Sequence, residues 1–289
     1  MVVQWKDEKH AVGVPEVDRQ HQQLFVITNQ LWQAQDMPDS PDRKARMIAG
    51  LKRLYAYCHY HFNDEEQLLR SKSYPEVPGH REIHRAFTAQ VKVHLLDTRD
   101  SPHPDLSGVL DSLVEWILNH IMGDDRHWAQ ALTADGVLWE EAREPHDTSV
   151  VSAWTDKNLS LELGGIDDQH RELIGILQQA NDLVLASPGR RKMFLPPVIR
   201  KLFYYSQFHF SFEEELMSRH AWPGLAEHRT LHGKFIRKIL QFAEQYKQGR
   251  TDLTDELVTF LKEWTIGHIL QEDKKFKDSL QIKGGGLLP

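Results

Sequence analysis

The chain has 289 residues, enough for two domains of ordinary size with a hydrophobic core in each. Its charged and hydrophobic fractions, 27% and 40%, are typical of a folded protein, and its formal net charge of -7 disfavours a general affinity for nucleic acid or an anionic membrane. The single cysteine, Cys58, excludes an intrachain disulfide framework and fits a reducing compartment.

The start of the chain, MVVQWKDEKH, has no apolar segment after a basic stretch. No apolar run of membrane-spanning length follows it. We therefore expect a cytoplasmic protein that neither inserts into a membrane nor binds nucleic acid.

Helical patterns fill the first half of the chain, and no segment of strand period and useful length interrupts them. Asp18 is the predicted N-cap of the first helix. Ser40 followed by Pro41 predicts the start of a long second helix, which ends near Ser71.

Two further helices complete this half. The third is predicted to follow Tyr74-Pro75 and to run to about Leu96, and Gly136 is the predicted stop of the fourth. The apolar face of the fourth helix is predicted at Leu106, Leu110, Leu113, Ile117 and Ile121.

The second half of the chain repeats the pattern. Asp167 is the predicted cap of its first helix, the sequence SPGR precedes its second, and Trp222-Pro223 stands where the first half has Tyr74-Pro75. The last apolar stripe of this half is predicted at Leu253, Leu257, Leu261 and Trp264.

The histidines show that this repetition is a tandem duplication. The chain contains 17 of them, more than packing requires. His21 and His170 are 149 positions apart, and four further pairs are 148 apart: His61 and His209, His80 and His228, His84 and His232, and His120 and His268. A period of this length indicates two whole domains, which we place at residues 1–147 and 148–289 with a polar boundary near 140–150. The predicted fold is all-α, two tandem up-down four-helix bundles, because short connections favour antiparallel neighbours.

The spacing of the repeated histidines is that of metal ligands. HFNDEE (61–66) and HFSFEE (209–214) each put a histidine and a glutamate at i and i+4, on one face of a helix, and His80 with His84 has the same spacing. Any one of these residues could belong to an ordinary core or surface turn, but the whole set keeps its register in both copies. Five imidazoles exceed the needs of one structural zinc, and carboxylates commonly bridge neighbouring cations. A dinuclear centre inside each bundle is therefore favoured.

The chain resembles the hemerythrins, and specifically bacterial hemerythrin-like domains, over nearly all of both halves. The resemblance lies in WKDEKHAVGVPEVDRQHQQL, HFNDEEQLL, YPEVPGHREIHRAF and WILNHIMGDD in the first copy. In the second copy it lies in WTDKNLSLELGGIDDQHREL, HFSFEEELM, WPGLAEHRTLHGKF and WTIGHILQEDKKF. It implies two iron ions per domain, joined by an oxo or hydroxo bridge, with O2 as the ligand.

The resemblance also implies a ligand set. In the first copy, one iron is assigned His80, His84 and His120, and the other is assigned His21 and His61. The carboxylates assigned as bridges between the two irons are Glu65 and Asp125. In the second copy the same roles fall to His228, His232 and His268; His170 and His209; Glu213 and Asp273. The iron with two histidines keeps an open position, at which O2 binds in this family.

Ordinary helix geometry disagrees with one of these assignments. The residue at i+4 from His120 is Asp124, whereas the family pattern selects Asp125 at i+5. Both copies have Asp at i+5, and Asp125 continues the inward row of Ile117 and Ile121. We therefore prefer Asp125, expect a local widening of the helix to bring it inward, and take Asp124 as a surface residue.

Apolar side chains are expected to wall off the open position and slow the loss of the bound ligand. The candidates are Leu24, Phe25, Phe62 and Leu69 in the first copy and Leu173, Phe210 and Met217 in the second, although a place in the ordinary bundle core is the simpler role for any one of them. Cys58 and its counterpart Ser206 are expected to serve packing. Seven histidines do not recur and are expected to be surface or structural residues: His10, His59, His94, His103, His127, His146 and His220.

Three classes of function agree with such a site. Reversible O2 binding for carriage, storage or delivery is the preferred one, because ligation rich in imidazole and with only two carboxylates gives little support to high-valent iron. Sensing of O2 or redox state would need a partner protein, since only the short tail QIKGGGLLP remains outside the two copies. An enzyme acting on peroxide or nitric oxide lacks a candidate acid or base beyond the ligands, so we do not expect an enzyme.

Overall fold

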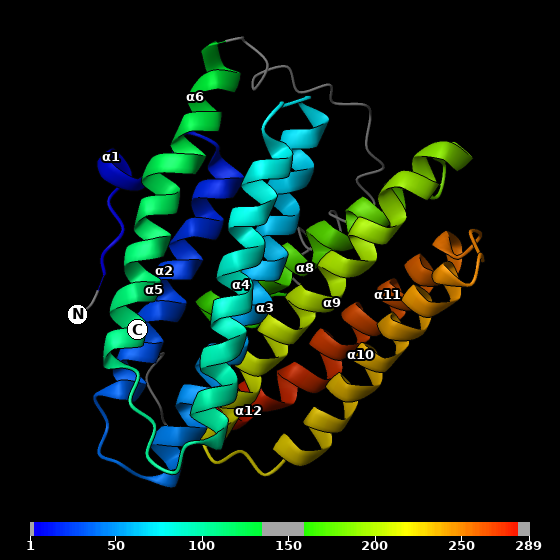
Figure 1. Ribbon diagram of the computed structural model, residues 1–289. Coiled ribbons are helices and arrows are strands. Elements are labelled where there is room, and N and C mark those ends of the chain that lie inside the picture. Colours follow the sequence, from blue (N-terminus) through cyan, green and yellow to red (C-terminus); the bar gives the residue numbers. More distant parts are fainter. Residues whose placement is uncertain (1–2, 135–158, 283–289) are drawn as a thin grey trace. The chain divides into compact units, whose positions relative to one another are not determined.

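The protein is described by a computed structural model that covers residues 3–134 and 159–282 (Figure 1). These residues form helices and no strand, so the predicted all-α class is confirmed. The chain separates into two compact units, Met1–Ala142 and Arg143–Pro289. The predicted boundary at 147/148 lies outside the described residues, and the division into domains at that point remains our proposal.

The first unit is a bundle of four helical rods. The second rod packs against the first and the third, and the fourth packs against the first. Its elements are α1 (Asp7–His10), α2 (Pro15–Gln35), α3 (Pro41–Ser71), α4 (Val77–Asp100), α5 (Ser107–Asn119), the π-helical turn η1 (His120–Asp125) and α6 (Arg126–Ala134). The last three run on as one rod, and α1 precedes the bundle (Figure 1).

The second unit has the same arrangement. Its elements are α8 (Gly164–Asp182), α9 (Pro188–Arg219), α10 (Leu225–Lys247), α11 (Thr254–His268), the π-helical turn η3 (Ile269–Asp273) and α12 (Lys274–Ile282). α9 packs against α8 and α10, and α11 packs against α8. α12 extends through Gln281 and Ile282, so the predicted start of the tail QIKGGGLLP is two residues too early.

The long second helix of each unit begins at a serine cap, as predicted. Ser40 is extended, and its hydroxyl accepts a hydrogen bond from the Arg43 amide at 3.1 Å. Ser187 plays the same part at α9, where it accepts from the Arg190 amide. In both cases the hydroxyl satisfies one of the amide groups that the first turn leaves without a partner.

The predicted caps of the first helices, Asp18 and Asp167, are wrong. α2 already begins at Pro15, and the Asp18 carboxylate instead accepts from the Val12 and Gly13 amides of the preceding segment. Asp167 likewise lies inside α8 and accepts from the Leu161 amide. An aspartate that binds amides upstream can stand a turn inside a helix, and sequence composition alone does not separate that role from a cap. The predicted stop, Gly136, lies outside the described residues.

Gly50 permits close packing between α2 and α3. A Cβ atom added there would lie 2.6 Å from Leu31 Cδ2, and the Leu31 side chain is fully buried. Gly175 in α8 is also helical, but an added Cβ meets nothing within 4 Å. Glycine is thus required by packing at one position and not at the other.

We expect Gly50→Ala to lower the free energy of unfolding of the first unit by about 1 kcal/mol, because overpacking costs about 1–3 kcal/mol and alanine returns about 1 kcal/mol of helix propensity. Gly175→Ala is the matched control and should stabilise the second unit by about 0.5–1 kcal/mol. Urea unfolding followed by circular dichroism measures both. A stabilising Gly50→Ala would show that α2 and α3 are further apart than described.

Each half should fold alone, because each has its own four-rod bundle and a size normal for an independent domain. The measurement is expression of residues 1–147 and 148–289 as separate chains, with helicity and cooperative thermal unfolding as the readout. Insoluble or unstructured halves would show that the two copies depend on each other for stability.

Candidate metal centre

The π-helical turn η1 places the last predicted ligand of the first unit. His120 opens the turn and Asp125 closes it, so these two residues are five apart across a wider turn than that of an α-helix. Asp125 is fully buried with its Oδ1 atom 3.1 Å from His120 Nε2, whereas Asp124 is 44% exposed. The expected widening is confirmed, and it turns the carboxylate at i+5 toward the histidine.

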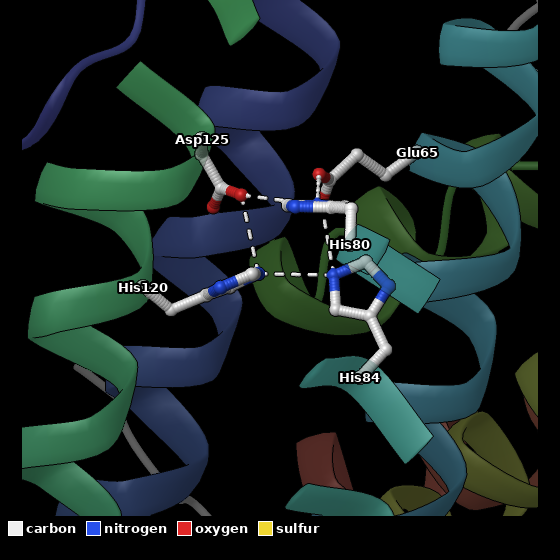
Figure 2. Close-up of side chains that lie close together, drawn as sticks. All are labelled: Glu65, His80, His84, His120 and Asp125. Atoms are coloured by element: carbon white, nitrogen blue, oxygen red, sulfur yellow. Dashed lines mark hydrogen bonds and ion pairs between the residues drawn. The ribbon is translucent and has the colours of Figure 1, made fainter. Parts of the chain in front are cut away.

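Seven side chains of the first unit meet in the middle of the bundle, and every helical rod contributes at least one. Their ligand atoms form two overlapping groups, within each of which all atoms lie within 4.8 Å of one another. Figure 2 shows the larger group, with the side chains pointing at a common centre. The groups are Glu65, His80, His84, His120 and Asp125, and His21, His61, Glu65 and Asp125.

The two carboxylates belong to both groups, and each turns one oxygen to each side. Glu65 Oε1 is 2.5 Å from His80 Nε2, while Glu65 Oε2 is 3.4 Å from His61 Nε2. Asp125 Oδ1 is 3.1 Å from His120 Nε2, while Asp125 Oδ2 is 3.2 Å from His21 Nε2. This division of oxygens is what two carboxylates bridging a pair of cations require.

The orientation of the imidazoles calls for a cation between them. His84 Nε2 and His120 Nε2 face each other at 2.9 Å. The other nitrogen of each ring lies against a carboxylate, His84 Nδ1 at 3.3 Å from Glu66 and His120 Nδ1 at 3.1 Å from Asp124. A carboxylate accepts a hydrogen bond, so the hydrogens are on the Nδ1 atoms. The two Nε2 atoms therefore present lone pairs to each other. A shared metal ion removes that repulsion.

Several buried polar atoms at the centre have no hydrogen-bond partner. They are His21 Nε2, His61 Nε2, Glu65 Oε2 and Asp125 Oδ2. An unsatisfied polar atom in a protein core costs about 1–3 kcal/mol, and more when it carries charge. Coordination to cations would satisfy all four at once, so the donor set fits a metal pair.

Burial keeps three of the imidazoles in the form that binds metal, whereas at His120, His170, His228 and His232 the nearby carboxylates outweigh burial and raise the pKa. Loss of solvation lowers the pKa of His61 and of His84 well below the usual value. In the second unit burial lowers the pKa of His209 to about 3. These rings are neutral at pH 7, as a metal-ligating imidazole must be.

The second unit gathers the counterparts of the same seven residues. Its two groups are Glu213, His228, His232 and His268, and His170, His209 and Glu213. Asp273 joins them from the end of η3, with Oδ1 3.2 Å from His268 Nε2 and Oδ2 3.4 Å from His170 Nε2. His232 Nε2 and His268 Nε2 again face each other, at 3.1 Å. All of the residues predicted as ligands in this half therefore lie together.

Sequence reasoning missed the polar residues that orient the ligands. Gln20 and Gln169 accept hydrogen bonds from His61 Nδ1 and His209 Nδ1 at 2.8 and 3.0 Å. Glu66 and Glu214 accept from His84 Nδ1 and His232 Nδ1 at 3.3 and 2.9 Å. The available signal was their recurrence: a glutamine precedes the first histidine of the site, and a second glutamate follows the bridging one, in both copies.

The predicted pocket residues are all buried, but not all of them line the side with two histidines. Phe62 stacks on His84 at a ring distance of 3.9 Å, and Phe210 stacks on His232 at 3.8 Å. Each phenylalanine also contacts the preceding histidine, which belongs to the other group: His61 at 5.3 Å and His209 at 5.6 Å. Leu69 belongs to a core cluster with Trp128. Phe25 lies nearer the other side, because Trp5 contacts both it and His21.

The histidines that do not recur between the two copies, and Cys58, are expected to be surface or structural residues. His10 is buried, accepts from the Lys6 amide and packs on Phe25. His103 and His127 are largely exposed, and His146 lies outside the described residues. Cys58 is fully buried, and burial raises the pKa of its thiol, as a packing role requires.

Comparison with known proteins identifies the family. The model of the hemerythrin HHE cation binding domain matches residues 12–132 and again residues 163–280. The chain belongs to the hemerythrin family. Hemerythrin domains bind a non-haem di-iron centre, and the two buried groups in each unit supply histidine and carboxylate donors for it.

Similar proteins have about the length of one half of this chain. A bacteriohemerythrin of Stenotrophomonas maltophilia (strain R551-3) is 33% identical over 128 residues, which are 44% of this chain and 80% of the relative. A bacteriohemerythrin of Clostridium acetobutylicum is 28% identical over 125 residues, 43% of this chain and 96% of the relative. A myohemerythrin of Theromyzon tessulatum is 30% identical over 122 residues, 42% of this chain and 87% of the relative. No solved structure matches the chain.

The family has mainly oxygen-binding members, and an iron-binding, oxygen-binding type of function follows for this hemerythrin. No helix in the described ranges, 3–134 and 159–282, is long and apolar enough to span a membrane. We propose the fourteen predicted residues as the iron ligands.

If both sets of ligands are used, the purified chain should bind about four iron ions, two in each half, and should lose thermal stability when they are removed, because unpaired buried donors remain. Metal analysis and thermal unfolding before and after chelation give the answer. Glu213→Ala is the matched variant and should reduce the content to about two. A saturated parent with about two irons would mean that one half does not bind metal.

Proposed function

We propose that this hemerythrin binds O2 reversibly at a di-iron centre in each of its two halves, for oxygen carriage, storage or delivery. The observation that carries the proposal is the unequal division of donors around the two shared carboxylates. Three histidines stand on one side of Glu65 and Asp125, and only His21 and His61 stand on the other. The side with fewer protein donors leaves room for an external ligand.

The residues of the chain prepare this side for a small neutral ligand. When bound, the iron pair supplies the electrons and the free coordination position that reversible O2 binding needs. His21, His61, Glu65 and Asp125 are each at most 1% exposed, so water is largely excluded around them. Exclusion of water slows loss of the ligand in a reduced form, which is the reaction that would end reversibility.

The donor set supports binding over catalysis. Each centre has five imidazoles and two carboxylates, whereas di-iron oxygenases of related architecture use mostly glutamate. Among the described polar residues that contact the ligands, Gln20 and Glu66 accept hydrogen bonds from ligand imidazoles and so are engaged in orienting them. We therefore propose a binding protein and not an enzyme. The names bacteriohemerythrin and myohemerythrin of the relatives agree with this.

The test is an anaerobic absorption spectrum of the reduced, iron-loaded chain before and after O2 is admitted. We expect a new charge-transfer band that disappears when O2 is removed and returns through several cycles. The double variant Glu65→Ala with Glu213→Ala is the control and should show no such band. Irreversible bleaching with release of peroxide would contradict the proposal and favour an enzyme or a sensor that responds once.

A further inference from the structure

The two centres have matching ligands but different neighbours. We propose that the first centre holds its iron more firmly, and has a lower reduction potential, than the second, because Asp64 and Asp124 support its histidine ligands. This inference rests on the proposed di-iron ligation, and it concerns the positioning residues of that site. The second centre has no counterpart of either contact among the described residues.

The first difference lies at the π-helical turns. Asp124 Oδ2 is 3.1 Å from His120 Nδ1 in η1. The corresponding residue of η3, Glu272, binds Lys275 Nζ with both carboxylate oxygens at 2.8 Å. A negative charge therefore stands against the imidazole of His120, while the charge of Glu272 is paired with a lysine away from His268.

The second difference lies behind the other group of histidines. Gln20 accepts from His61 Nδ1 through Oε1 and donates through Nε2 to Asp64 Oδ2 at 2.8 Å. The amide thus connects the imidazole to a carboxylate. Gln169 accepts from His209 Nδ1 in the same way, but the residue at the position of Asp64 is Phe212.

A carboxylate behind a metal-ligating imidazole strengthens that ligand. It accepts the Nδ1 hydrogen, increases electron density at Nε2 and fixes the ring in one orientation. Its negative charge also favours ferric over ferrous iron by direct attraction, which lowers the reduction potential. Removal of such outer contacts typically costs about 10–100-fold in metal affinity. Asp124 is 44% exposed, so solvent screens its charge and the lower end of that range applies to it.

One contact in the first centre acts in the opposite sense on the potential. Trp128 Nε1 donates to Glu65 Oε1 at 2.9 Å, and Phe276 stands at the equivalent position in the second unit. An N–H donor withdraws charge from the bridging carboxylate. It is a neutral dipole, however, whereas Asp64 and Asp124 each bring a full negative charge. The carboxylates therefore decide the sign, and the indole adds a fixed orientation of Glu65.

The contacts shared by both centres isolate these differences. Glu66 and Glu214 support His84 and His232 alike, and both glutamates also pair with an arginine of the following helix. Trp116 and Trp264 stack on the last histidine of each site at 4.6 and 4.2 Å. These shared contacts leave the difference in charge at Asp64 and Asp124. A further difference is uncharged: Trp222 contacts the His228 ring at 5.7 Å.

The experiment uses the full-length, iron-loaded chain with one centre silenced at a time. Glu213→Ala leaves only the first centre and Glu65→Ala only the second, which an iron content of about two per chain verifies. Under anaerobic conditions we would measure iron release to a chelator and the midpoint potential by spectroelectrochemical titration. We expect release from the first centre to be slower by about tenfold and its potential to be lower.

Exchange of the supporting carboxylates then tests the cause. With only the first centre active, Asp124→Asn and Asp64→Asn should each speed iron release by several-fold and raise the potential. With only the second centre active, Glu272→Gln is the matched control and should change neither. Circular dichroism verifies that every variant is folded.

Equal release rates and potentials in the two single-centre chains would overturn the inference, as would an Asp124→Asn effect no larger than that of Glu272→Gln. If Glu65→Ala or Glu213→Ala unfolds its half, the two iron-release rates are measured as the two kinetic phases of the parent chain. The phase that changes in Asp124→Asn is then assigned to the first centre. None of these measurements involves O2. A failure of reversible O2 binding is therefore observed separately from a failure of this inference.

Discussion

The burial of metal donors constrains the rest of each half of the chain. Five imidazoles and two carboxylates occupy a position that apolar side chains would normally fill, and several of their atoms have no hydrogen-bond partner. Cations that satisfy these donors stabilise such a core. Four helical rods are needed because no single helix face can present so many donors to one point. Folding, metal binding and ligand capture therefore depend on the same atoms.

The same constraint explains the local departures from regular helix geometry. The π-helical turns η1 and η3 each lie where the last histidine and the last carboxylate must face the same ions. A regular helix would direct Asp124, not Asp125, toward the histidine face. The wider turn directs Asp125 inward and leaves Asp124 at the edge, where it contacts the far side of the His120 ring. One distortion thus places both the proposed bridging carboxylate and the carboxylate that contacts His120 from outside.

Duplication preserved the donors and allowed their surroundings to change. Each ligand of the first half has a counterpart in the second, yet Asp64 corresponds to Phe212 and Trp128 to Phe276. The residues behind a ligand alter how firmly a metal is held and at what potential it is oxidised. One chain can therefore carry two centres with different properties. The relatives compared above match 42–44% of this chain.

The sequence by itself determined the helical class, the duplication and the recurring histidines, because spacing of i, i+4 and recurrence at about 148 residues are properties of the chain alone. The choice of Asp125 over Asp124 came from the resemblance to the hemerythrins, since ordinary helix spacing favours Asp124. The tertiary structure alone revealed that Asp18 binds the segment before its helix, that Gln20 links His61 to Asp64, and that Trp128 reaches Glu65. Periodicity specifies which side chains share a face of one helix. Contacts between helices depend on their relative rotation and register, which only the packed bundle fixes.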